Sequence, residues 1–143
     1  MGGDDGADDP RIDAALVPIS SAADIVSARQ RGRELAARIG FSGSDLTVIA
    51  TAISELARNI VEYAKRGTIE VSLARRGSRL GLQIVARDKG PGIRDVARAL
   101  QDGYSTGKGL GLGLPGVRRL MNELEIDSKA GHGTLVSARK WLA

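Results

Sequence analysis

The 143-residue sequence has ordinary hydrophobic (42%) and charged (27%) fractions and no cysteine, which predicts one soluble, cytoplasmic domain without disulfides or thiolate metal sites. Its net charge of +4 is uneven: residues 1–9 hold four Asp and no Lys or Arg, so the remainder carries +8. The aromatic content of 3% argues against a surface on which nucleic-acid bases stack, and the lack of an apolar run near roughly twenty residues argues against a membrane span. The single histidine, His132, argues against a histidine metal cluster and against a Ser-His-Asp triad.

The chain begins with a segment that has almost nothing to bury. Residues 1–10 are acidic and glycine-rich without the basic-then-apolar layout of a signal peptide, which predicts a disordered acidic tail before a single domain at 11–143. The stretch "AALVPIS" (14–20) is typical of a strand, and Pro18 favours an edge position because proline lacks the N–H of a ladder hydrogen bond.

Two helices are expected next. Ser20 or Ser21 can cap the first, whose apolar stripe runs to about Ile39, and Ser44 can cap the second, which continues to about Lys65. In each helix the apolar residues recur at helical spacing on one face, as expected of a helix that packs on a sheet.

In the second half of the sequence the predicted strands and the predicted helices occur in groups. The stretches "TIEVSLARR" and "RLGLQIVAR", joined by "GS", predict a hairpin. Residues 94–101 then predict a short helix, and a second helix is expected to begin at Pro115. The stretches "ELEIDSKA" and "GTLVSARKW" predict a closing hairpin. The resulting order, β-α-α-β-β-α-α-β-β, predicts an α/β (α+β) sandwich, in which a mixed, largely antiparallel sheet is covered on one face by helices.

The stretch "STGKGLGLGLPGV" (105–117) places glycine at alternate positions, which costs a helix roughly 1 kcal/mol for each residue and weakens a strand. Its "GLGLPG" lacks the βαβ context of a dinucleotide site. The common phosphate-loop motif also fails, because Asp102 stands where its first glycine belongs and Gly109 where its Ser or Thr belongs. A flexible surface loop and a phosphate-binding backbone both remain open at this point.

A polar pair lies on the second helix. Glu55 and Asn59 are four residues apart and share a helix face, which also carries the apolar Val48 and Ala52 and lies nearly opposite the core stripe. Apolar residues on the outer face of a helix indicate that another element covers it. Such a polar pair alone is common on solvated helices, so its meaning depends on the other motifs.

Glycine-flanked polar residues also follow two strands. In "DKGPGI", Asp88 ends an apolar strand, and Gly90 and Gly92 leave room for a flat ring to approach the backbone. In "GHGT", Thr134 follows a glycine-rich hairpin turn. Each could be a simple turn.

Together, E-x-x-x-N, D-x-G-x-G, the alternating glycines and G-x-G-T resemble the nucleotide site of the GHKL ATPase superfamily, which includes gyrase and the histidine kinases. From about residue 12 to the C-terminus, stretches such as "AISELARNI" and "DGYSTGKGLGLGLPGVRRLM" are most similar to the anti-sigma-factor-type serine/threonine kinases of stressosome switches. The resemblance implies a Bergerat-type ATP-binding fold, with the glycine tract as a lid and phosphate cradle over ATP.

The resemblance also implies roles for individual residues. Glu55 would be the general base, Asn59 would coordinate Mg²⁺, and Asp88 with Thr134 would bind the adenine amino group. Gly90 and Gly92 would shape the adenine pocket. The residues implied to hold the phosphates are Gly107, Lys108, Gly109, Leu110, Gly111 and Gly113, with Lys108 only as a candidate contact.

By the same resemblance, the expected protein is an ATP- and Mg²⁺-dependent serine/threonine kinase. Its substrates would be STAS-domain proteins of a stressosome, and it would activate a PP2C-type phosphatase as a partner switch; no nucleic acid or membrane is expected. Two alternatives remain open: an anti-sigma kinase that binds a sigma factor directly, and a non-catalytic ATP-gated interaction module. A detached histidine-kinase domain fits less well, because His132 lies in a predicted hairpin turn.

Overall fold

The computed structural model describes residues 14–90, 113–128 and 131–143. The predicted acidic tail, the helix at 94–101 and the glycines up to residue 111 lie outside the described ranges. The elements, in chain order, are β1 (Ala14–Ile19), α2 (Ala22–Ile39), α3 (Ser44–Asn59), the π-helical turn η2 (Ile60–Ala64), β2 (Gly67–Arg76), β3 (Arg79–Asp88), α5 (Gly113–Leu120), β4 (Glu123–Ser128) and β5 (Thr134–Trp141).

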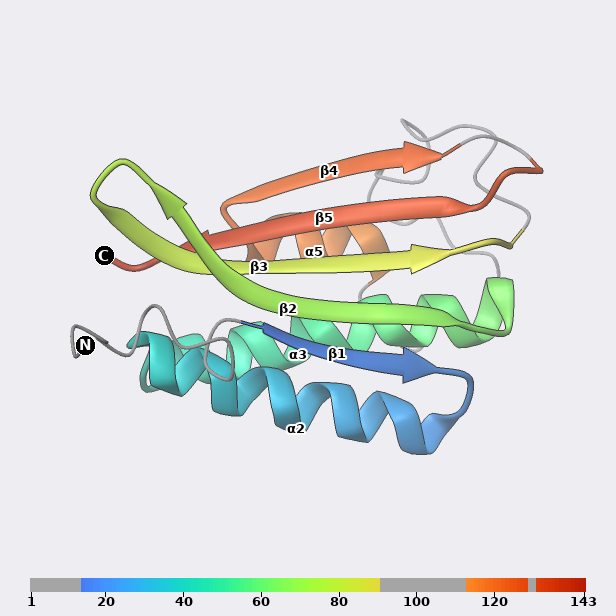
Figure 1. Ribbon diagram of the computed structural model, residues 1–143, viewed down its shortest axis with the longest axis horizontal. Coiled ribbons are helices and arrows are strands. Elements are labelled where there is room, and N and C mark those ends of the chain that lie inside the picture. The colour runs from blue at the N-terminus through green and yellow to red at the C-terminus, as the bar shows by residue number, and fades with distance from the viewer. Residues whose placement is uncertain (1–13, 91–112, 129–130) are drawn as a thin grey trace, which may run out of the picture.

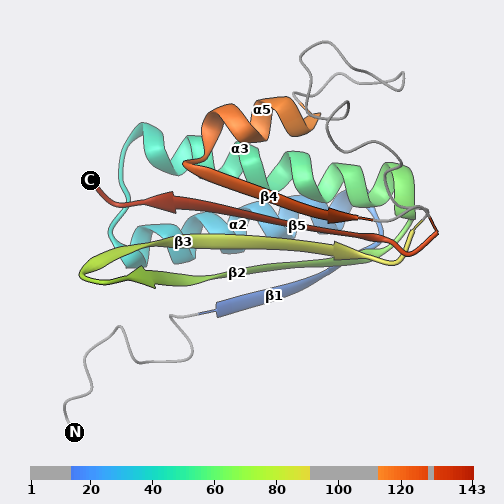
Figure 2. The same cartoon turned by 90° about the horizontal axis from the view of Figure 1, so that it is seen from above.

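The five strands form one sheet in the order β1-β2-β3-β5-β4, and each of the four described pairs is antiparallel. The three α-helices that the structure describes, α2, α3 and α5, lie on one face of this sheet (Figures 1 and 2). β1 is an edge strand, as Pro18 indicates, and the predicted fold class is confirmed. Both predicted hairpins form, β2 with β3 and β4 with β5, and β5 lies between β3 and β4.

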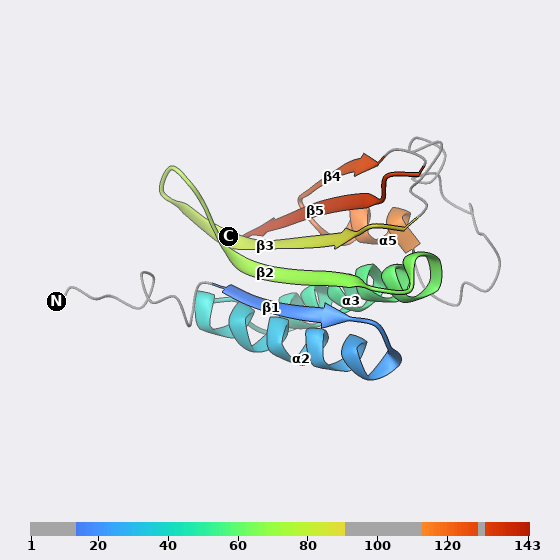
Figure 3. The ribbon, with the colours of Figure 1, turned by 45° about the vertical axis from the view of Figure 1, so that its right-hand side comes forward.

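The core lies between the sheet and the helices. α2 packs beside β1 and β2, whereas α5 lies at the β4–β5 side (Figure 3). Gly32 of α2 is buried, and a Cβ there would lie 2.2 Å from Cδ1 of Ile53 on α3, so its lack of a side chain lets the two helices approach closely. The predicted core stripe of α2 is buried as expected at Ile25, Ala28, Gly32, Leu35 and Ala36.

The boundaries of the second predicted helix differ from the expectation at both ends. Gly43, with φ of 59°, is the N-cap, and Ser44 is the first helical residue, because glycine adopts this left-handed backbone without strain. At the other end the α-helix stops at Asn59, and η2 extends the coil to Ala64. Lys65 then has a φ of 75°, which ends the helix with a reversal usually taken by glycine.

The open face of the sheet carries a charged cluster around Glu123 of β4. Its carboxylate accepts two hydrogen bonds from Arg76 and one from Trp141 Nε1, and the Arg76 guanidinium lies 4.8 Å from the centre of the Trp141 ring. The pKa of Glu123 is lowered from 4.5 to about 2, mainly by the hydrogen bond from Arg76 and next by the hydrogen bond from Trp141. The hydrogen bonds of Glu123 therefore link the β2–β3 hairpin to β4 and β5 most strongly while Glu123 is ionised.

The stability that Glu123 contributes should be lost in acid. Because its folded-state pKa is depressed, this contribution is present above about pH 4.5 and disappears as the pH falls towards 2. Glu123→Gln should therefore lose less stability than the wild type across this window. Urea denaturation midpoints at several pH values measure the difference, with Glu34→Gln on the exposed face of α2 as the matched control. Parallel acid profiles for wild type and Glu123→Gln would contradict this account.

Candidate nucleotide-binding and catalytic site

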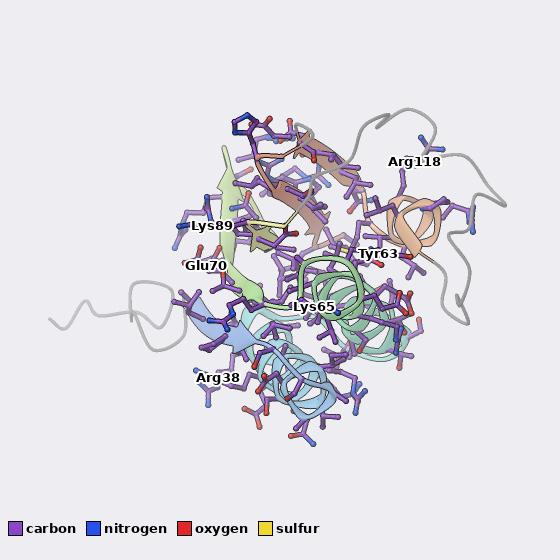
Figure 4. All side chains as sticks on the ribbon, turned by 90° about the vertical axis from the view of Figure 1, so that its right-hand side faces the viewer. Arg38, Tyr63, Lys65, Glu70, Lys89 and Arg118 are labelled. Atoms are coloured by element: carbon purple, nitrogen blue, oxygen red, sulfur yellow. The ribbon has the colours of Figure 1, made fainter. Side chains whose placement is uncertain are left out.

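The sequence motifs meet at one end of the molecule, where β3 and α3 end and where α5 and β5 begin. Figure 4 looks onto this end. Three labelled basic side chains, Lys65, Lys89 and Arg118, surround it from different elements and are exposed. The carboxylates of Glu55 on α3 and Asp88 at the end of β3 lie at the same end.

The first group of site residues forms a row across three strands. Asp88 of β3 is the register partner of Thr134 of β5, which in turn is the partner of Ser128 of β4. The Asp88 Oδ1 atom accepts the N–H of Gly90 at 2.8 Å, and the Ser128 and Thr134 hydroxyl oxygens are 2.8 Å apart. The structure thus brings together Asp88 and Thr134, which are 46 positions apart in the sequence. Together with their neighbours they line a pocket formed by Arg87, Asp88, Asp127, Ser128, His132, Gly133, Thr134 and Leu135.

Two glycines keep the backbone of this region close together. A Cβ on Gly90 would lie 2.6 Å from the Cβ of Ala64, so glycine there allows the segment after β3 to pack against η2. Gly133 has a φ of 85°, and a Cβ on it would lie 2.3 Å from the carbonyl oxygen of Asp88. The sequence motif includes Gly133 only as part of a turn, whereas in the structure it holds the start of β5 against Asp88.

Glu55 is the second element of the site. Its residue surface is only 7% exposed, although it is charged. The Oε2 atom pairs with Nη1 of Arg58 at 2.5 Å, and Oε1 accepts the N–H of Gly113 at 3.2 Å. Buried carboxylates require such partners, because an unpaired buried charge is very costly. Glu55 therefore has a fixed orientation between α3 and the first residue of α5.

The element that covers the outer face of α3 is α5. The sequence indicates such a cover from the apolar Val48 and Ala52, and in the structure Ala52 is fully buried. Figure 2 shows α5 alongside α3. The partner of Glu55 on its own helix, Arg58, was not singled out by the sequence analysis. Its i,i+3 spacing from Glu55 is the signal that could have identified it.

Asn59 is the last residue of α3 and is half-buried, one helical turn beyond Glu55. The following π-helical turn, η2, is a rare geometry that is frequent at functional sites. No three His, Cys, Asp or Glu side chains gather into a metal-binding cluster within the described ranges. An Asn amide combined with phosphate oxygens is a donor set that suits Mg²⁺, which binds few protein ligands and keeps several others from substrate or water.

The structure describes only Gly113, the last residue of the predicted phosphate cradle. The other predicted cradle residues, Gly107, Lys108, Gly109, Leu110 and Gly111, lie outside the described residues, as does Gly92 of the predicted adenine pocket. Gly113 is described as the first residue of α5, with a φ of 67°. Its N–H donates to Glu55, so the end of the glycine tract is bonded directly to the carboxylate predicted to be the base.

Residues 19–140 match the family model of the histidine kinase-like ATPase domain. Because the match spans most of the sequence and agrees with the fold, the chain belongs to this family. None of the helices that the structure describes is long and apolar enough to cross a membrane.

The more particular relationship is to serine/threonine-protein kinase RsbT of Bacillus subtilis. The two are 50% identical over 130 residues, which cover 91% of this chain and 98% of the relative. An anti-sigma F factor of a Thermoanaerobacter species is 29% identical over 113 residues, 75% of this chain and 78% of that protein. The relative that is 50% identical, together with the family model, confirms the predicted enzyme class, an ATP-dependent serine/threonine-protein kinase.

A solved structure gives the same result for the fold. The RsbU and RsbW domains of Rv1364c from Mycobacterium tuberculosis align with a TM-score of 0.57 and 25% identity over 89% of this chain. The chain spans about a third of that protein, since the alignment covers 31% of it. The fold, the family model and the relatives are consistent with a kinase that acts in partner-switch signalling.

Proposed function

We propose that this protein is a cytoplasmic kinase that uses ATP and Mg²⁺ to phosphorylate serine or threonine of STAS-domain antagonists, and that the released kinase activates a PP2C-type phosphatase. The observation that carries the proposal is the buried Glu55, held by Arg58 and Gly113 one turn before Asn59. The 50% identity to a serine/threonine-protein kinase over nearly the whole chain supports it.

The nucleotide base is assigned to the row on the sheet. Asp88 would accept a hydrogen bond from the adenine amino group, and Thr134, its register partner, would contact the same edge of the ring. Gly90 and Gly92 would complete the adenine pocket. A carboxylate opposite an amino group is a charge-assisted contact, and such contacts are roughly twice as strong as those between neutral groups.

The phosphates are assigned to the other side of the site. Gly107, Lys108, Gly109, Leu110, Gly111 and Gly113 would contribute to the cradle, and the N-terminus of α5 adds a positive helix dipole. Asn59 would hold Mg²⁺ through its amide oxygen. When bound, Mg²⁺ neutralises charge on the β- and γ-phosphates.

Glu55 would accept the proton of the serine or threonine hydroxyl as the hydroxyl oxygen attacks the γ-phosphorus; the bond from that phosphorus to the bridging oxygen would break, and ADP would be the leaving group. The Arg58 pair and the Gly113 N–H orient the carboxylate before substrate arrives. Phosphoryl transfer depends mostly on positioning and on charge neutralisation, so this small set of groups is sufficient.

The deciding experiment is to incubate the protein with ATP, Mg²⁺ and a panel of STAS-domain proteins, and to map the phosphorylated residues by mass spectrometry. We expect transfer to serine or threonine of at least one STAS protein, and activation of a PP2C-type phosphatase by the free kinase. A sigma factor is included as bait in a pull-down. Capture of the sigma factor would favour the anti-sigma alternative, and nucleotide binding without any transfer would favour a non-catalytic, ATP-gated module.

A further inference from the structure

Ser128, the last residue of β4, makes two hydroxyl contacts beside the pocket. Its Oγ donates to the carbonyl oxygen of Gly133 at 3.0 Å, and it lies 2.8 Å from Oγ1 of Thr134. Ser128 is half-buried and lines the same pocket as Thr134 and Asp88. No function is assigned to Ser128 by its motif or by the roles proposed above.

Together, the two contacts determine which hydroxyl donates in the hydrogen bond between Ser128 and Thr134. A serine hydroxyl has one proton, and a carbonyl oxygen can only accept, so the proton of Ser128 lies towards Gly133. Both contacts are then hydrogen bonds only if Thr134 donates its proton to Ser128. In this arrangement the Thr134 hydroxyl has no proton left for a ligand and offers it only lone pairs.

We propose that Ser128 is a specificity-determining residue that makes Thr134 an obligate acceptor beside Asp88, so that the pocket selects a 6-amino purine over a 6-oxo purine. The inference rests on the proposed nucleotide function and deepens it. An amino group at position 6 donates to an acceptor. An oxygen there is itself an acceptor and is repelled by both the Asp88 carboxylate and the oriented Thr134 hydroxyl.

Without Ser128 the Thr134 hydroxyl is free to rotate, and it can then donate to a 6-oxo group. The Asp88 carboxylate remains an acceptor, so Ser128→Ala reduces discrimination without abolishing it. A single directed hydrogen bond contributes about a factor of ten to an equilibrium. We therefore expect the preference for ADP over IDP to fall about tenfold, mainly because IDP binds more tightly.

The test is calorimetric titration of the full-length protein with ADP and with IDP, the inosine analogue whose base carries a 6-oxo group, in the presence of Mg²⁺. The variants are Ser128→Ala, Ser128→Thr and, as matched control, Ser137→Ala, which changes a half-buried serine on the opposite face of β5. Ser128→Thr keeps a hydroxyl and should restore the ADP preference, and Ser137→Ala should retain it.

The outcomes separate this inference from the proposed function. An unchanged ADP-to-IDP ratio in Ser128→Ala, or an equal loss of both affinities, would overturn the specificity role while leaving nucleotide binding intact. Wild-type protein that binds IDP as tightly as ADP would overturn it as well. Wild-type protein that binds neither nucleotide would instead contradict the proposed function on which the inference rests.

Discussion

Glu55→Gln is expected to lower phosphoryl transfer by about 10²–10⁴-fold while ATP still binds close to the wild-type affinity. Glutamine preserves the size of the side chain, and its amide oxygen can still accept the N–H of Gly113. It cannot take up the proton of the attacking hydroxyl, so only the chemical step should suffer. Single-turnover transfer of radiolabelled phosphate to a STAS substrate at saturating ATP measures that step directly.

The matched control is Glu62→Gln, the same chemical change at an exposed position of η2, and it should transfer phosphate at the wild-type rate. Calorimetry with an ATP analogue tests whether Glu55→Gln keeps its nucleotide site. The proposed phosphatase activation would depend on a protein contact and should therefore survive in this variant. Transfer by Glu55→Gln at the wild-type rate would show that Glu55 is not the base.

Asn59→Ala should behave differently, because its proposed role is in binding. Removal of the amide oxygen takes away the protein ligand for Mg²⁺, so Mg²⁺-dependent nucleotide affinity should fall by roughly 10–100-fold or more, and transfer should disappear with it. Nucleotide titrations with and without Mg²⁺ provide the internal control. Wild type and variant should differ strongly in Mg²⁺ and only slightly in its absence.

The pair of variants tests the division of labour on α3. Glu55 and Asn59 are four residues apart, so damage to the helix would affect both variants alike. Thermal unfolding should show similar stability for both. If Asn59→Ala retains Mg²⁺-dependent affinity, the metal is held elsewhere, and Asn59 serves only to end α3.

Much of the fold follows from the sequence, because its determinants are local. The apolar spacing of α2, from Ile25 to Ala36, places one stripe on one face of a helix, and that stripe is buried. Alternation in the two hairpins fixes which side chains face the helices, and the loop between them fixes each register. The polar face of α3 and its apolar neighbours likewise indicated a covering element, which is α5.

Local patterns did not determine the ends of α3. Ser44 is a good capping residue by type, but the chain enters the helix through Gly43, whose positive φ a serine would adopt only with strain. The π-helical turn after Asn59 has no simple sequence signature. Its last residue, Ala64, packs against Gly90, which follows β3 and lies 26 residues further along the chain.

By itself the sequence predicted the elements that the structure describes and the buried face of α2. Through a motif resemblance it also led to the residues of the proposed site, Glu55, Asn59, Asp88 and Thr134. The tertiary structure alone decided which atoms meet there. β5 inserts between β3 and β4, so Asp88, Thr134 and Ser128 form one row, and α5 brings the Gly113 N–H to Glu55. These contacts join segments far apart in the chain, and periodicity reports only on a residue's own element. Long-range pairing is chosen by the packing of the whole sheet against its helices.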